Sequence, residues 1–97
     1  MSSNEILLIL KDYKKEKGHD YGIIDLGIFG STARGEDNED SDIDVVIRFQ
    51  RPNLFDMAGI KFDLEERLRK TVDLVSYREN MNLFLKQRID KDAVYVW

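Results

Sequence analysis

Three aspartates are spaced so that their carboxylates could act together. Asp42 and Asp44 stand two positions apart, where a polar stretch passes into the apolar run Ile43–Phe49. Because side chains alternate across a strand, both would project from the same face. Asp73 interrupts the apolar segment 72–75, which we expect to be a buried strand, and a buried charged group requires a partner. If the two segments are neighbouring strands, the three carboxylates converge, and Mg²⁺ is the hard cation that such oxygen ligands prefer.

A glycine turn precedes these aspartates. Gly30 and Ser31 follow the apolar segment Ile23–Phe29, and the chain continues as Thr-Ala-Arg-Gly. A strand that ends in such a turn leaves backbone N–H groups unpaired beside a hydroxyl, which suits phosphate oxygens. Glycine also lets a ligand approach the backbone closely. A Gly-Ser pair is often an ordinary turn, and a lone aspartate at a strand end is often only a solvated terminus. The prediction of a site therefore depends on the combination of the Gly-Ser turn with the three aspartates.

Two other phosphate or metal motifs do not match. Gly30 and Gly35 have the spacing of a P-loop, but Glu36 stands where that motif requires lysine. The acidic series that begins at Asp40 has the spacing of an EF-hand loop, but Val45 stands at its obligatory glycine. A phosphate-binding turn followed by metal-binding aspartates is instead the arrangement that nucleotidyl transfer needs, with two metal ions holding the attacking and leaving oxygens.

Apolar periodicity predicts the elements that position these residues. We expect helices over residues 1–17, 53–69 and 81–89, strands over 23–29, 43–49, 71–77 and 93–97, and a polar loop over 36–42. Ser2 and Glu5 predict a capping box, Gly18 the end of the first helix, and Pro52 a break. The continuous run 45–47 predicts a central strand. The fold class is α/β (α+β), a small mixed sheet flanked by helices.

Composition limits the function classes. The chain has 97 residues, 42% of them hydrophobic, which predicts a single domain over 1–97. Its formal net charge of −4 makes nucleic acid an unlikely partner. The absence of cysteine excludes disulfides, a thiol nucleophile and cysteine-ligated zinc. Neither an apolar run of membrane-spanning length nor a secretion signal is present, so we expect a cytoplasmic protein without membrane contact.

The segments 30–36 and 41–47 resemble the signature of the polymerase-beta-type nucleotidyltransferase superfamily. The chain is most similar to the minimal nucleotidyltransferases, which are antitoxin partners of HEPN-domain toxins. The resemblance extends from about Ile23 to Val96, and no motif position departs from the pattern. It implies a polymerase-beta-like core, without the further domain that larger relatives use to hold an acceptor.

The resemblance implies a role for each motif residue. Gly30 and Ser31 would bind the β- and γ-phosphates of a nucleoside triphosphate. Asp42 and Asp44 would ligate two Mg²⁺ ions. Asp73 would ligate the ion nearer the acceptor and help to deprotonate the acceptor hydroxyl, which bound metal would already acidify.

The resemblance assigns a less specific role to Arg34. This arginine would neutralise phosphate charge during nucleotide binding. From its position in the turn it could equally pair with Glu36 or Asp37.

The implied activity is Mg²⁺-dependent transfer of AMP from ATP to a hydroxyl, namely a tyrosine of a partner HEPN toxin, which the transfer inactivates. One alternative is an antitoxin that neutralises its toxin by binding alone. Another is nucleotidyl transfer to a small molecule or to an RNA end. The preference for ATP over other nucleoside triphosphates rests on the resemblance, since the sequence identifies no residue that would recognise the adenine base.

Overall fold

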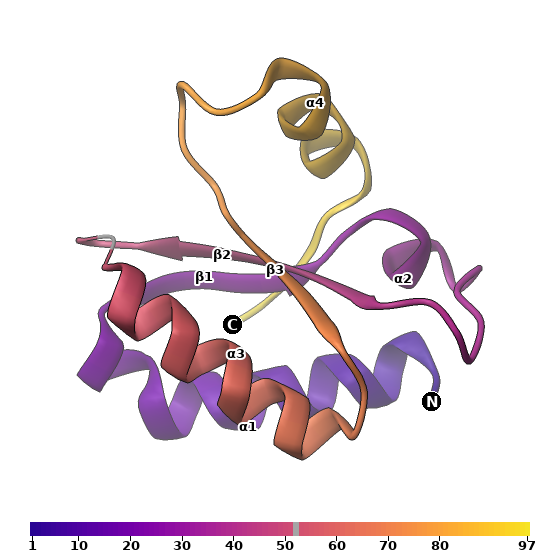
Figure 1. The fold of residues 1–97 in the computed structure, drawn as a ribbon, viewed down its shortest axis with the longest axis horizontal. Helices are drawn as coiled ribbons and strands as arrows, with labels where there is room; N and C mark the ends of the chain where they lie inside the picture. Colours follow the sequence, from indigo (N-terminus) through magenta and orange to yellow (C-terminus); the bar gives the residue numbers. More distant parts are fainter. Residues whose placement is uncertain (52) are drawn as a thin grey trace.

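The computed structural model describes residues 1–51 and 53–97. Its helices and strands follow the predicted order (Figure 1). They are α1 (Ser3–Tyr21), β1 (Ile23–Ile28), α2 (Gly30–Arg34), β2 (Ile43–Phe49), α3 (Leu54–Leu68), β3 (Val72–Ser76), α4 (Leu83–Asp92) and β4 (Val94–Val96). The break predicted at Pro52 lies outside the described residues. Within the described ranges, no helix has the length and apolar character needed to cross a bilayer.

The four strands form one mixed sheet in the order β3-β2-β1-β4. β1 runs antiparallel to both β2 and β4, whereas β2 and β3 are parallel. The parallel pair is joined through α3, as a crossover connection requires. Val45, Val46 and Ile47 of β2 are fully buried, which confirms the prediction of a central strand. The predicted mixed sheet flanked by helices is therefore the fold of this chain.

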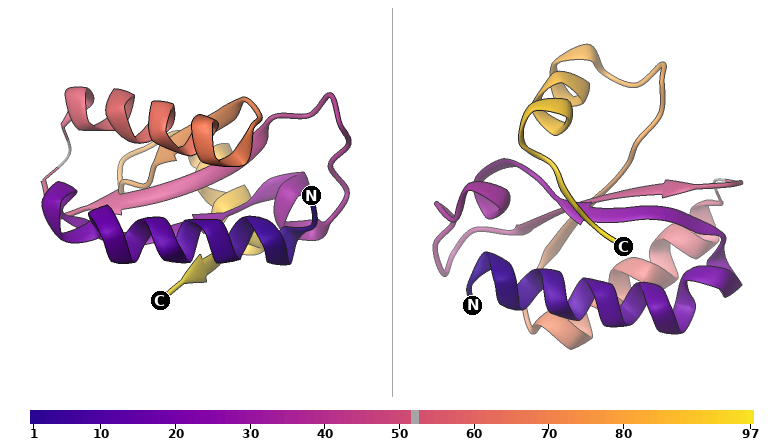
Figure 2. Two further views of the ribbon diagram at one scale, coloured as in Figure 1. Left: turned by 90° about the horizontal axis from the view of Figure 1, so that it is seen from below. Right: turned by 180° about the vertical axis from the view of Figure 1, so that it is seen from behind.

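Helices cover the two faces of the sheet unequally. α1 and α3 lie side by side on one face, and α4 stands on the other (Figures 1 and 2). The larger core lies under α1 and α3 and includes Leu10, Tyr13 and Leu64. A smaller cluster under α4 joins Phe29 of the β1–α2 junction, Val46 of β2 and Ile89 of α4. This cluster fixes α4 above the end of β1.

The first helix is longer than predicted. The capping box is present, with the Glu5 N–H donating to Ser2 Oγ at 3.2 Å and the Ser2 N–H donating to Glu5 Oε1 at 3.1 Å. The prediction that Gly18 ends the helix is wrong, because Gly18 is buried inside it. The helix continues to Tyr21, and Gly22 ends it at φ 66°. Glycine takes this left-handed conformation readily.

Asparagine side chains set the starts of the later helices. Asn53 accepts hydrogen bonds from the N–H groups of Phe55 and Asp56, so α3 begins at Leu54. Asn82 accepts from the Leu85 N–H at 3.1 Å. The last helix therefore begins at Leu83 instead of residue 81, and it extends to Asp92 instead of residue 89.

Candidate active site

The candidate site lies where β1 ends and where β2 and β3 begin. In the parallel pairing of β2 with β3, Asp44 stands directly beside Asp73. The antiparallel pairing of β1 with β2 brings the end of β1 to the same place, where the Phe29 N–H donates to the Asp44 carbonyl oxygen at 3.1 Å. The expectation that the segment around Asp73 forms the strand next to β2 is thus confirmed. Two of the three predicted carboxylates come from neighbouring positions on adjacent strands.

The Asp44 carboxyl is electrostatically perturbed by its surroundings. Its partial burial, followed by the charge of Asp73, raises the pKa of Asp44 above its ordinary value. Asp42 and Asp37 add to the increase in pKa, and the positive charge of Arg88 opposes it. The site therefore concentrates negative charge that the protein's own cations only partly balance. Such a site favours the binding of a cation.

Asp42 and Asp73 are exposed to solvent. The expectation that Asp73 is buried among apolar neighbours is wrong, because β3 is an edge strand and Asp73 lies on its solvated side. In the described part of the chain, no three acidic or histidine side chains stand at the spacing of a preformed metal site. Mg²⁺ commonly binds through one or two carboxylates together with substrate phosphates and water. Asp44 and Asp73, side by side on adjacent strands, fit an ion that binds with a triphosphate. The expected convergence of all three carboxylates on one metal site is not found among the described residues.

The glycine turn forms α2, a single helical turn directly beside Asp44. Gly30 is buried and has φ 59°, a conformation that side-chain-bearing residues rarely adopt. A Cβ at Gly30 would lie 2.9 Å from Asp44 Oδ2. The first helical bond runs from the Ala33 N–H to the Phe29 carbonyl oxygen, so the N–H groups of Gly30 and Ser31 precede it. The structure therefore brings the predicted phosphate turn against the predicted metal-binding carboxylate.

Thr32 connects the turn to β2, and the sequence interpretation did not identify it. The Asp44 N–H donates to Thr32 Oγ1 at 3.0 Å, and Thr32 is completely buried. The Thr32 carbonyl oxygen accepts a hydrogen bond from Ser3 Oγ at 2.6 Å. Thr32 thus holds the backbone of Asp44 in place. A threonine within a glycine turn carries no sequence signal for this role, since its partner lies twelve residues away.

We expect Thr32→Val to reduce both stability and nucleotidyl transfer. Valine has nearly the same shape but leaves the partly buried Asp44 N–H without an acceptor, at a cost of about 1–3 kcal/mol in the free energy of unfolding. Thr32→Ser keeps the hydroxyl and should keep most of the transfer rate. Urea unfolding and a transfer assay on both variants test this. Equal transfer rates for the valine and serine variants would show that this hydrogen bond does not position Asp44.

The arginine beside the aspartates is a different residue from the one that the sequence suggested. The Arg34 guanidinium pairs with Glu36 at 2.9 Å and also with Asp92 of α4. Of the two pairings that the sequence suggested, the one with Glu36 is therefore present. The guanidinium next to Gly30 and Asp44 belongs to Arg88, whose Nη2 would lie 3.3 Å from a Cβ on Gly30. A direct phosphate contact by Arg34 stays a prediction.

Comparisons with known proteins agree with this arrangement. The family model described as "Nucleotidyltransferase domain" matches residues 5–96. The protein adenylyltransferase MntA of Thermococcus cleftensis is 34% identical over 97 residues, which cover 99% of this chain and 97% of that protein. A Methanocaldococcus jannaschii protein is 35% identical over 94 residues, which cover 96% of each chain.

Solved structures show the same fold. A structure described as a minimal nucleotidyltransferase is 32% identical, with a TM-score of 0.77 over 97% of this chain and 95% of that one. A toxin–antitoxin structure with AMP-PNP (TM-score 0.72, 22% identity) covers all of this chain and 73% of that one. The complex of a tri-AMPylated Shewanella oneidensis HEPN toxin with its antitoxin (TM-score 0.62, 21% identity) covers 98% of this chain and 68% of that one.

The family match spans nearly the whole chain, and relatives above 30% identity cover 96% and 99% of it. The same residues form the mixed sheet, the glycine turn and the paired aspartates described above. This chain belongs to the nucleotidyltransferase domain family and is a nucleotidyltransferase of the minimal type.

Proposed function

We propose that this chain transfers AMP from ATP to a hydroxyl group of a protein. The observation that supports this most directly is the contact between the buried Gly30 turn and Asp44, with Asp73 beside Asp44 on the next strand. The turn offers N–H groups to phosphate oxygens, and the carboxylates offer ligands to Mg²⁺. The relative from Thermococcus cleftensis carries the name protein adenylyltransferase, which supports a protein as the acceptor.

The proposed reaction is a displacement at the α-phosphorus of ATP. The acceptor oxygen forms a bond to that phosphorus, the bond to the bridging oxygen breaks, and pyrophosphate leaves with the electron pair. Asp73 accepts the hydroxyl proton and passes it to water. Mg²⁺ bound at Asp42 and Asp44, with Asp73 ligating the ion nearer the acceptor, would supply Lewis acidity and neutralise the developing charge.

The other predicted residues act on the nucleotide. Gly30 and Ser31 bind the β- and γ-phosphates through the N–H groups that precede the first helical bond of α2. Arg34 keeps its predicted part in neutralising phosphate charge. Its pairs with Glu36 and Asp92 also join α2 to α4, so it supports the site from the side.

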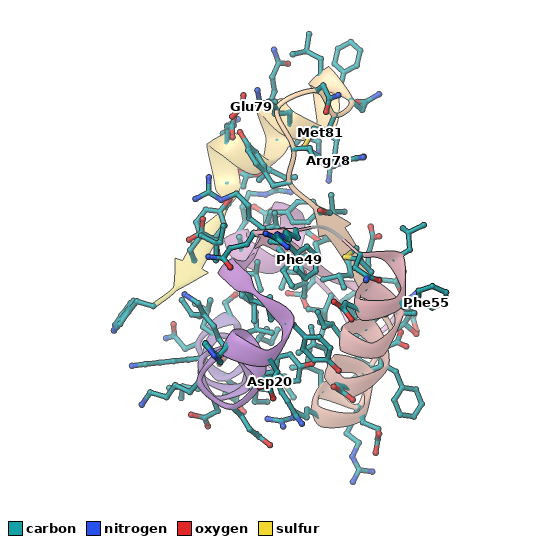
Figure 3. All side chains as sticks on the ribbon, turned by 90° about the vertical axis from the view of Figure 1, so that its left-hand side faces the viewer. Asp20, Phe49, Phe55, Arg78, Glu79 and Met81 are labelled. Atoms are coloured by element: carbon teal, nitrogen blue, oxygen red, sulfur yellow. The ribbon has the colours of Figure 1, made fainter. Side chains whose placement is uncertain are left out.

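We further propose that the acceptor is a tyrosine of a HEPN-domain toxin and that the chain acts as its antitoxin. The Shewanella oneidensis complex, named as a tri-AMPylated HEPN toxin with its antitoxin, is the precedent. Large apolar side chains are exposed on two helices of this chain: Phe55 and Phe62 on α3, and Leu83 and Phe84 on α4. Figure 3 shows Phe55 on the outer side of α3. Exposed apolar groups of this size are typical of surfaces that bind other proteins.

Mass spectrometry of the acceptor tests this proposal. A HEPN-domain protein of the same organism is incubated with the chain, ATP and Mg²⁺, and we expect whole AMP units to appear on its tyrosine residues. The Asp42/Asp44/Asp73 triple aspartate-to-asparagine variant is the control. If that variant neutralises the toxin as well as the wild type does, binding alone suffices and the catalytic antitoxin is contradicted. An unmodified HEPN protein would direct attention to small-molecule or RNA acceptors.

A further inference from the structure

Arg88 stands at the nucleotide site although it lies outside every motif of the sequence. α4 follows β3 by a connection that contains Arg78, Glu79 and Met81, which lie far from α1 and α3 (Figure 3). The helix then returns over the sheet and contacts α2 (Figure 1). Ile89 is completely buried against Phe29 and Val46. This anchoring fixes the direction in which the adjacent Arg88 side chain projects.

The Arg88 guanidinium lies against the glycine turn. Its Nη2 would be 3.3 Å from a Cβ at Gly30, and the same point is 2.9 Å from Asp44 Oδ2. The absent side chain of Gly30 therefore leaves a small space between a guanidinium and a carboxylate. Within residues 1–51 and 53–97, Arg88 takes part in none of the ion pairs. Arg34, in contrast, is held by Glu36 and Asp92.

A triphosphate needs a cation at this position. The site contributes three carboxylates, Asp42, Asp44 and Asp73, and the nucleotide brings several further negative charges. A guanidinium presents N–H donors in a planar fork that matches two phosphate oxygens, and it keeps its charge at every relevant pH. Because Arg88 adjoins the glycine turn, its guanidinium is placed toward the phosphates that the turn would bind.

From this placement, and resting on the proposed function, we infer that Arg88 binds the β- and γ-phosphates of ATP and neutralises the pyrophosphate as it leaves. The bond that breaks joins the α-phosphorus to the bridging oxygen, and its electron pair passes to the pyrophosphate. The charge of Arg88 therefore stabilises the transition state, in which negative charge develops on the leaving pyrophosphate, more than the bound ATP. Arg34 then supports the site from the side, through the ion pairs that join α2 to α4.

Binding measurements separate this role from a general loss of fold or charge. Arg88→Gln should weaken the binding of AMP-PNP in the presence of Mg²⁺ by about ten- to a hundredfold, since a charge-assisted contact is lost. The same variant should bind AMP, which lacks the β- and γ-phosphates, as the wild type does. Arg88→Lys should recover part of the affinity, because it restores the charge without the fork. Lys91→Gln, an equal change of charge at an exposed position of α4, should bind AMP-PNP normally.

The outcomes distinguish this inference from the proposed function. If wild-type protein binds AMP-PNP and transfers AMP, while Arg88→Gln retains wild-type affinity, only the role of Arg88 is overturned. An equal loss of AMP-PNP and AMP binding in Arg88→Gln would also overturn it, since the effect would not involve the outer phosphates. If the wild type binds no nucleotide, the proposed function fails and the role of Arg88 fails with it.

Discussion

Asp44→Asn is expected to abolish nucleotidyl transfer while leaving the fold intact. The variant keeps the shape of the side chain but removes the charge that would bind Mg²⁺ beside the phosphate turn. Loss of one strong electrostatic contribution of this kind lowers a rate by at least about a hundredfold. The measurement is the initial rate of AMP transfer at saturating ATP and Mg²⁺. Asp25→Asn, which removes a carboxylate of β1 that pairs with the half-exposed Arg48, is the matched control and should remain active.

Although Asp44→Asn should abolish transfer, we expect it to increase the stability of the folded protein in the absence of Mg²⁺. Burial and the charge of Asp73 raise the pKa of Asp44 in the folded protein above its value in the unfolded chain. Because the pKa of the Asp44 carboxyl is higher in the folded state, the folded protein loses stability as the pH rises from the unfolded-state pKa to the folded-state pKa. Without Mg²⁺, Asp44→Asn should therefore unfold at a higher temperature than the wild type at pH 7, and the difference should vanish below the ordinary aspartate range of about 3.9.

Added Mg²⁺ should reverse that order. An ion that binds only the folded state raises its stability. With AMP-PNP present to supply phosphate ligands, the wild type should therefore gain in unfolding temperature on addition of Mg²⁺, and Asp44→Asn should gain much less. If the variant transfers AMP at the wild-type rate, Asp44 is not a ligand of the reacting centre. A variant that is less stable than the wild type at pH 7 without Mg²⁺ would contradict the electrostatic description of the site.

Gly30→Ala is expected to have the second large effect. Alanine at φ 59° carries a backbone strain of about 1–2 kcal/mol, and its Cβ would lie 2.9 Å from Asp44 Oδ2. The carboxylate must then move, and a displacement of a reacting group by about 1 Å lowers a rate by about a hundredfold. We therefore expect a loss of stability together with a loss of transfer. Chemical unfolding and the transfer assay measure the two effects separately.

Gly35→Ala provides a matched control at the other end of α2. Gly35 has a similar φ of 71°, so the backbone strain is similar. The nearest atom to its added Cβ is Ser3 Oγ at 3.8 Å, an ordinary contact. This variant should lose comparable stability and keep its transfer rate. Equal transfer by both alanine variants would mean that the space beside Gly30 has no part in the reaction.

The pairing of Asp44 with Asp73 was accessible from the sequence because it depends on local patterns. The apolar run 45–47 marks a central strand, and the helix that follows it favours a parallel neighbour. The exposure of Asp73 was not accessible, because the pattern of a short apolar run does not distinguish an edge strand from a buried one. The end of α1 was placed too early because a buried glycine inside a helix has the same sequence signature as one that ends it.

Thr32 and Arg88 could not be found from the sequence for a different reason. Thr32 acts through a hydrogen bond to the backbone of Asp44, and backbone partners leave no trace in residue types. Arg88 reaches the site only because Ile89 anchors α4 over the end of β1. That placement is a property of tertiary packing. Motif spacing therefore identified the residues of the turn and of the paired strands, and it missed those that reach the site from elsewhere.

The most direct test of nucleotidyl transfer uses ATP labelled at either the α- or the γ-phosphate. Both are incubated with the chain, Mg²⁺ and the proposed HEPN-domain acceptor, and the label on protein is counted. Attack at the α-phosphorus predicts that the α-label enters the acceptor, that the γ-label leaves as pyrophosphate, and that Asp44→Asn transfers neither. Transfer of the γ-label to protein, or α-label incorporation that persists undiminished in Asp44→Asn, would contradict nucleotidyl transfer at this site.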